Sequence, residues 1–272
     1  MVNDCSITNN GNPSGFLAGQ SDGTLNASGN WWGGTSDTAI AALMTGSVDF
    51  TPYLDSGTDT DPVTPGFQGS FAILHVTALG AQTGPVGRIQ EGVNTVSSDG
   101  TVLIDEGAYS ENFTLAANIT VLGAGSGNNP ATDSIVTSAA GSTPVITITG
   151  DGASPANPLV VGNLFVQGAT GPEVDASGIS LSAPGANYTF TNVVSANNAG
   201  DGLTQNLGSG GNTNILVTGC TFSTNAIVGF RVPTAGGIDG LTVINSHFDG
   251  NTYGIEVVMV RDEKLALLSF SK

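Results

Sequence analysis

Residues 217–230 decide the fold; they read Val-Thr-Gly-Cys-Thr-Phe-Ser-Thr-Asn-Ala-Ile-Val-Gly-Phe. The pattern returns 26 positions later, at residues 243–256, as Val-Ile-Asn-Ser-His-Phe-Asp-Gly-Asn-Thr-Tyr-Gly-Ile-Glu. Each copy holds short runs in which apolar and polar residues alternate, and Asn or Gly separates the runs. Alternation of this kind predicts strands, and Asn and Gly tolerate the left-handed backbone of turns. The two copies therefore predict short strands joined by tight turns.

Two series of residues keep this period over a longer stretch. The first series comprises Asn163, Asn192, Gly219 and Asn245, at steps of 29, 27 and 26 residues. The second series comprises Asn198, Asn225 and Asn251, at steps of 27 and 26 residues. Two features that share one period indicate a structural repeat rather than a bias in composition.

A repeat of this length leaves no room for a crossover helix, which an ordinary parallel sheet requires. A coil solves the problem, because each strand then pairs with its counterpart one turn later, about 4.8 Å away. Inward apolar side chains stack in columns, and an Asn at a turn can bond the Asn of the next turn. We therefore predict an all-β, right-handed parallel β-helix, a solenoid. Its structural ladder comprises Asn163, Asn192 and Asn245, with Asn198, Asn225 and Asn251.

The same alternation extends back to Thr101, and residues 101–105, 119–123, 145–148 and 159–161 read as earlier coils. Ahead of them, residues 85–96 predict a short amphipathic helix. Its apolar residues fall at helical spacing: Val86, Ile89, Val93 and Val96. Pro85 suits the first helical position. Because a solenoid leaves the apolar end of its first coil open, we expect this helix to be an N-terminal cap.

Three motifs follow one another in this region: Arg-Ile-Gln-Glu-Gly-Val at 88–93, Gly-Thr-Val-Leu-Ile-Asp-Glu-Gly-Ala-Tyr-Ser-Glu-Asn at 100–112, and Ile-Thr-Val-Leu-Gly at 119–123. Together they resemble the opening of pectin-lyase-like parallel β-helix proteins. The first coil is especially similar to that of pectinesterase-like proteins and of bacterial and archaeal surface β-helix proteins. The resemblance implies the fold but selects no activity, since such helices serve as lyases, hydrolases, esterases and inert stalks.

The N-terminal part is similar to a different element of such proteins. Asn-Trp-Trp-Gly-Gly at 30–34, with Val-Asp-Phe-Thr-Pro-Tyr-Leu at 48–54, resembles a tail that closes β-helix modules in large bacterial surface proteins. We therefore interpret the chain as four segments: 1–54, the last coils and cap of an upstream β-helix; 55–70, a linker; 71–257, the first part of a second β-helix; and 258–272, an atypical tail. The tail breaks the repeat, and it reads either as non-native or as a short capping helix.

The formal net charge is −17, with only five Lys and Arg residues. Phosphate binding needs clustered basic residues, so the sequence argues against nucleic acid and against anionic membranes as partners. No apolar run approaches the length of a membrane span. The N-terminus is polar and shows no export signal. Cys5 and Cys220 are far apart in the sequence, and we do not expect them to form a disulfide.

The sequence shows no catalytic constellation. Asp201, Arg231 and Asp239 lie on successive coils, as the carboxylates and Arg of pectinesterase-like catalysis would, but the Gln-bearing motifs of that family are absent. His247 lacks the paired Asp residues that polygalacturonase-like hydrolysis requires, and we expect it to be a rung residue. We expect His75 to be a loop or strand residue. We assign no catalytic residue and no cofactor.

Two clusters are candidates for binding. Asp55, Asp59 and Asp61 could hold Ca²⁺, which takes several carboxylate oxygens, or could belong to a solvated linker. Trp31 and Trp32 could stack on sugar rings or could close the end of a coil.

These observations predict a non-catalytic structural or adhesive β-helix module of a secreted or cell-surface protein. Its partner would be a polysaccharide or another cell-surface protein. The alternative is a fragment of a pectinesterase-like or lyase-like enzyme that acts on polysaccharide and lacks its catalytic coils.

Overall fold

The computed structural model describes residues 1–8, 10, 16–17, 23–139, 141, 143–171, 176–205, 211–233, 238–257 and 268–271. About 40% of the chain is strand and 6% is helix, which confirms the all-β class. Parallel coils occur in two compact units, residues 1–105 and 106–272, with about eight turns in all. The predicted parallel β-solenoid is therefore confirmed, and each unit is described by itself.

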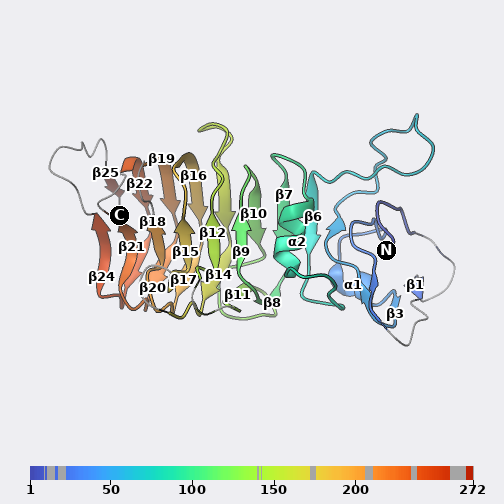
Figure 1. Cartoon of the computed structure of the whole chain (residues 1–272), viewed down its shortest axis with the longest axis horizontal. Helices are drawn as coiled ribbons and strands as arrows, with labels where there is room; N and C mark the ends of the chain where they lie inside the picture. The colour runs from blue at the N-terminus through green and yellow to red at the C-terminus, as the bar shows by residue number, and fades with distance from the viewer. Residues whose placement is uncertain are drawn as a thin grey trace. The chain divides into compact units, whose positions relative to one another are not determined.

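The second unit consists of three parallel ladders of strands that succeed one another at every turn (Figure 1). The first ladder comprises β10 (Thr120–Gly123), β13 (Leu159–Gly162), β16 (Gly185–Thr191), β19 (Asn212–Thr218), β22 (Ile238–Ile244) and β25 (Leu268–Ser271). The second comprises β8 (Gly107–Ser110), β11 (Ser134–Thr137), β14 (Leu164–Gln167), β17 (Val194–Ala196), β20 (Thr221–Ser223) and β23 (His247–Asp249). The third comprises β9 (Phe113–Leu115), β12 (Ile146–Ile148), β15 (Ile179–Leu181), β18 (Leu203–Gln205), β21 (Val228–Val232) and β24 (Tyr253–Val257).

Alternation along each strand produces the core of this unit. In the first ladder, one register column is fully or almost fully buried and comprises Val121, Val161, Phe190, Val217 and Val243. The neighbouring position in each strand faces outward and is partly exposed, as Thr189 and Thr242 show. Each fully buried aliphatic or aromatic side chain contributes about 1.5–3 kcal/mol to folding. The columns therefore supply the main stabilisation, and one coil alone would bury little.

Asn residues mark the turns, where two kinds of ladder form. Asn163, Asn192 and Asn245 all have left-handed backbone, with φ of 54°, 51° and 50°. Asn192 Nδ2 donates to Asn163 Oδ1 at 3.3 Å, and Gly219 takes the equivalent left-handed position one coil later. Gly is the one other residue that adopts this conformation without cost, which explains its place in the Asn series.

The second Asn series is buried and forms a continuous chain of side-chain hydrogen bonds. Asn198 Nδ2 donates to Asn225 Oδ1 at 2.9 Å, and Asn225 Nδ2 donates to Asn251 Oδ1 at 3.1 Å. Asn225 also donates to the carbonyl of Ser195, and its oxygen accepts from the backbone of Asn198. Buried amides are stable only when they are bonded in this way, so the series fixes the coils in register.

The first unit contains short paired strands and two helices. Its elements are β1 (Phe16–Leu17), β2 (Leu25–Asn26), α1 (Asp37–Ala41), β3 (Met44–Thr45), β4 (Val48–Asp49), β5 (Tyr53–Leu54), β6 (Ile73–Val76), α2 (Arg88–Thr95) and β7 (Thr101–Ile104). The pairs β1–β3, β2–β4 and β6–β7 are parallel, whereas β5 runs antiparallel to β6. A core of six buried residues fills the N-terminal part: Ala27, Trp32, Ile40, Val48, Phe50 and Tyr53.

The predicted N-terminal helix is present as α2, but it begins later than we expected. Its N-cap is Gly87, so Pro85 lies before the helix and Val86 is exposed. Ile89 and Gly92 form the buried face. A Cβ on Gly92 would come within 2.7 Å of Val76 Cγ2, which shows how closely α2 packs on β6.

The predicted boundaries stay predictions, although two details bear on them. Residues 55–70 contain no strand or helix. Strand β25, within the tail at 258–272, pairs in parallel with β22, and Leu268 lies opposite Leu241. That step of 27 residues equals the period of the solenoid. The rest of the tail lies outside the described residues.

We predict that Phe190→Ala lowers the free energy of unfolding by about 3–5 kcal/mol, because it opens a cavity in a fully buried column. The outward substitution Thr213→Ala on β19 should change it by less than about 0.5 kcal/mol. Denaturant unfolding followed by circular dichroism measures both. Equal effects of the two substitutions would contradict the assignment of inward and outward faces.

Candidate functional site

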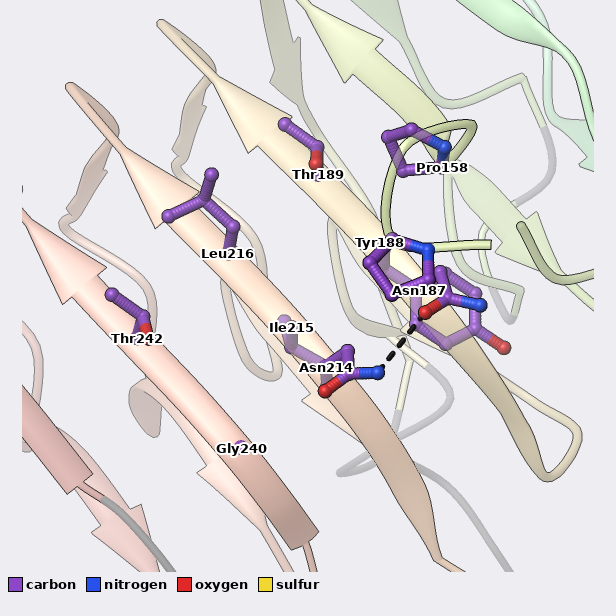
Figure 2. Close-up of a pocket in the computed structure, with 10 residues that line it drawn as sticks. Pro158, Asn187, Tyr188, Thr189, Asn214, Ile215, Leu216, Gly240 and Thr242 are labelled. Carbon is purple, nitrogen blue, oxygen red and sulfur yellow. Dashed lines mark hydrogen bonds between the residues drawn. The ribbon is translucent and has the colours of Figure 1, made fainter. Parts of the chain in front are cut away.

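A groove of about 280 Å³ lies on the outward face of β16, β19 and β22. Its lining residues are Pro155, Pro158, Asn187, Tyr188, Thr189, Asn214, Ile215, Leu216, Gly240 and Thr242 (Figure 2). Three successive coils contribute equivalent positions, so the groove crosses the strands rather than following one of them. It is therefore a product of the repeat, and it could accommodate an extended ligand.

One side of the groove is formed by a third row of left-handed residues. Asn187, Asn214 and Gly240 have φ of 63°, 53° and 72° and occupy the same place in three neighbouring strands. Asn214 Nδ2 donates to Asn187 Oδ1 at 3.1 Å, and Asn187 Nδ2 donates to the carbonyl of Gly152 at 3.0 Å (Figure 2). Each strand bends at this row, and the bend exposes amide groups to the groove.

The floor alternates hydroxyl and apolar side chains. Thr189, Leu216 and Thr242 are register partners on β16, β19 and β22, and all three are partly exposed. Pro158 lies near Asn187 and Tyr188 at one end, where Pro155 also contributes (Figure 2).

The chemistry of the groove is neutral. None of the described residues that line it is charged. Burial raises the pKa of Tyr188 to about 12, and the nearby Asp151 carboxylate acts in the same direction, so the phenol stays protonated at ordinary pH. Its hydroxyl donates to the carbonyl of Gly150 at 3.2 Å. The exposed Asp239 precedes Gly240 in β22, so the charge next to the groove is negative. Amides, hydroxyls and apolar surfaces suit binding, and they supply neither a general base nor a strong nucleophile.

Trp31 and Trp32 do not form an open platform for sugar rings. Trp32 is 4% exposed and belongs to the core of the first unit. Trp31 is partly exposed, and its indole is approached so closely by Gly57 that no side chain would fit there. The alternative that we kept open, a role in closing the coil, agrees with this packing.

Asp55, Asp59 and Asp61 do not share one site. Among the described residues, no group of three or more His, Cys, Asp and Glu side chains could hold a metal ion. Asp55 is bonded to His75, while Asp59 accepts from the backbone of Asp61. Asp61 accepts from Thr64 Oγ1 at 2.6 Å, and that bond lowers the pKa of its exposed carboxyl. These carboxylates stabilise turns instead of converging, which the spacing in the sequence could not show.

The residues weighed for catalysis are brought together in part. Arg231 Nε lies 2.9 Å from Asp201 Oδ2 and 3.4 Å from Glu256 Oε2. Asp239 belongs to β22, in a different ladder. Sequence analysis missed Glu256, although one more step of the repeat places it beside Arg231 in register.

The Asp201 side chain is fully buried. Burial raises the pKa of its carboxyl, and the charge of Arg231 and the backbone N–H of Val228 oppose that rise. The described contacts make this group an ion pair that ties β21 to the preceding turn and to β24.

The remaining predicted residues occupy separate places. His247 lies in β23, is largely exposed and is 3.9 Å from Asp249. His75 lies in β6 and is buried. Cys5 and Cys220 are both free. No helix within the described ranges is both long and apolar enough to cross a bilayer.

We predict that Arg231→Met lowers the free energy of unfolding by about 3 kcal/mol at pH 7, because it leaves the Asp201 charge buried and unpaired. Since the folded-state pKa of Asp201 lies above its ordinary 3.8, the stability linked to its proton is present at low pH and lost as pH rises through the folded pKa. Without Arg231 that pKa rises further. The deficit should therefore be smaller at pH 4 than at pH 7 in denaturant titrations, whereas Arg231→Lys should retain most of the stability. A deficit independent of pH would contradict this account.

Comparisons with known proteins place the chain in no group: no family model, no curated protein and no solved structure matches it.

Proposed function

We propose that the protein is a non-catalytic structural and adhesive module of a secreted or cell-surface protein, and that it binds neutral polysaccharide weakly along the groove on β16, β19 and β22. The observation that carries the proposal is the uncharged lining of that groove, with amide, hydroxyl and apolar groups repeated on three coils. A repeating ligand is the natural partner for a repeating surface, because each coil can offer its neighbour's contacts again.

The composition of the groove supports a glycan rather than a peptide or a nucleic acid. Sugars present hydroxyls together with apolar C–H faces, and Thr189, Leu216 and Asn214 offer matching groups within one groove. Phosphate-rich polymers need clustered Lys or Arg. Arg231 is the single basic residue between Arg88 and Arg261, and it lies in another ladder.

Charge favours neutral over acidic polysaccharide. The chain carries a formal charge of −17, and Asp239 stands beside the groove. A uronic-acid polymer would meet repulsion with no cation in the lining to offset it. A shallow site with a few amide and hydroxyl contacts supports affinities on the order of 1 mM per site, so adhesion would depend on many copies.

The rigid coil supports the adhesive part of the proposal. Buried columns and the chain of hydrogen bonds through Asn198, Asn225 and Asn251 hold successive coils in fixed register. A surface that changes little on binding loses little entropy when it contacts a ligand. This pre-organisation suits a stalk that displays the same contacts along its length.

A second candidate is a pectin-lyase-like enzyme that acts on polysaccharide. The observation in its favour is the cluster of Asp201, Arg231 and Glu256, in which a buried carboxyl with a raised pKa adjoins an Arg. Release of reducing ends, unsaturated products or methanol from pectin-type polymers would support the enzyme, and loss of that activity in Asp201→Asn would assign it to this cluster.

We predict that the protein binds neutral polysaccharides more tightly than polyuronates, and that Thr242→Arg weakens neutral-glycan binding by about tenfold, which is about 1.4 kcal/mol. The Arg side chain would fill the floor of the groove. Affinity electrophoresis in gels that contain one polymer each would measure retardation, and titration calorimetry with soluble oligosaccharides would give the dissociation constants.

Thr147→Arg is the matched control, because Thr147 occupies an outward position on β12 in another ladder. It should leave neutral-glycan binding unchanged. Equal loss in both variants, or preferential retention by polyuronate gels, would refute the assignment of the groove.

A further inference from the structure

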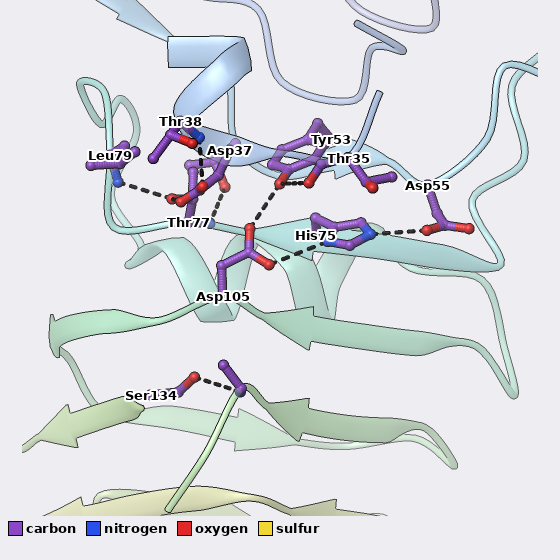
Figure 3. Close-up of polar contacts among 12 residues, drawn as sticks. Thr35, Asp37, Thr38, Tyr53, Asp55, His75, Thr77, Leu79, Asp105 and Ser134 are labelled. Atoms are coloured by element: carbon purple, nitrogen blue, oxygen red, sulfur yellow. Dashed lines mark hydrogen bonds and ion pairs between the residues drawn. The ribbon is translucent and has the colours of Figure 1, made fainter. Parts of the chain in front are cut away.

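His75 is held between two carboxylates in the first unit (Figure 3). Its Nε2 lies 2.9 Å from Asp55 Oδ1, and its Nδ1 lies 3.3 Å from Asp105 Oδ1. The His75 side chain is 11% exposed, compared with 17% for Asp105 and 38% for Asp55. One imidazole ring therefore joins three segments: the residue after β5, strand β6, and the residue after β7.

Both ring nitrogens must donate in this arrangement. Ionised carboxylates only accept hydrogen bonds, and a neutral imidazole has a single N–H. A neutral His75 could bond one carboxylate, but it would point a lone pair at the other. The two contacts are satisfied together only by the imidazolium, which carries a proton on each nitrogen and a charge that both carboxylates stabilise.

Tyr53 fixes the ring and one of its partners. Its ring stacks on His75, with centroids 5.1 Å apart and an interplanar angle of 11°. Its hydroxyl donates to Asp105 Oδ2 at 2.7 Å, so the carboxylate is oriented from both sides. Tyr53 and His75 are direct partners in the antiparallel pair of β5 and β6. The imidazolium thus reinforces a pair only two residues long.

The other charged groups on the elements packed against β6 have their own partners. Asp37 of α1 accepts from Thr77 Oγ1 at 2.7 Å. Helix α2 contacts β6 through Gly92 and Val76, and its Arg88 donates to the carbonyls of Leu79 and Gly80. Glu91 accepts from Gln82.

We propose that His75 is a pH-sensitive latch: as an imidazolium it holds β5 and the residue after β7 to β6, and loss of one proton releases this junction. A rise in pH would leave the β5–β6 pair with two backbone partners and a lone pair facing a carboxylate. The first unit would then loosen where residues up to Leu54 join β6.

The electrostatics agree with the geometry. Burial by itself lowers the pKa of His75, but the hydrogen bonds and charges of Asp105 and Asp55 outweigh it and raise the pKa above the ordinary 6.5. Because the folded-state pKa is raised, the latch contributes its full stability below pH 6.5, and that contribution is lost as pH rises through the folded pKa.

The chain contains only two His residues, which makes a direct test practicable. We would follow the ring signals of His75 and His247 by NMR in the full chain as pH rises. We expect His75 to titrate at higher pH than the exposed His247, with both of its nitrogens protonated at pH 6. In Asp55→Asn the His75 midpoint should shift to lower pH. A His75 midpoint at or below that of His247, or a ring with one proton at pH 6, would overturn the proposal.

Thermal unfolding across pH provides the second measurement. His75→Asn should lower the unfolding midpoint of the first unit by about 5 °C at pH 6 and by less at high pH, because the wild type has then lost its own latch. His247→Asn is the matched control and should change neither value. A His75→Asn deficit that is constant with pH would show that the ring acts through packing alone. If His75→Asn does not fold, the Asp55→Asn titration still decides the question.

Discussion

The second unit depends on one constraint, the parallel hydrogen bonding of each strand to its counterpart one turn later. Because this pairing fixes the spacing between coils, every residue meets the equivalent residue of the next coil at the same distance. Apolar residues at equivalent positions form buried columns, as Val161, Phe190 and Val217 do. Amides at equivalent positions can bond each other, as Asn225 and Asn251 do. The constraint therefore selects residues by column rather than singly.

The groove follows from the same constraint. A left-handed residue in one strand bends that strand, and its neighbours must bend at the same place to keep their pairing. Asn187, Asn214 and Gly240 meet this requirement, since Asn and Gly adopt positive φ most readily. The bend opens a furrow whose lining repeats the chemistry of the columns beside it. A neutral, repeating surface is thus what this architecture provides where no charged residue occupies those columns.

The sequence revealed what repeats and concealed what does not. The period of the Asn series predicted the solenoid, and the alternation predicted its buried columns. The groove was missed because Asn187 and Asn214 lie outside the two series, and their shared left-handed backbone has no signal beyond residue type. The start of α2 was misplaced because Pro85 suits a helix start, whereas Gly87 is the N-cap. The partners of His75 are 20 and 30 residues away in an antiparallel pair that no period marks.

The absence of a long period in the first unit also explains why polar bonds are so specific there. Without stacked columns, its strands are two to four residues long, and particular side chains join them. Asp37 bonds Thr77, Asp49 bonds Thr83, and His75 bonds Asp55 and Asp105. Bonds of this kind depend on protonation state, whereas buried apolar columns do not. A response to pH is therefore expected where the repeat fails, and insensitivity to pH is expected along the columns that the repeat builds.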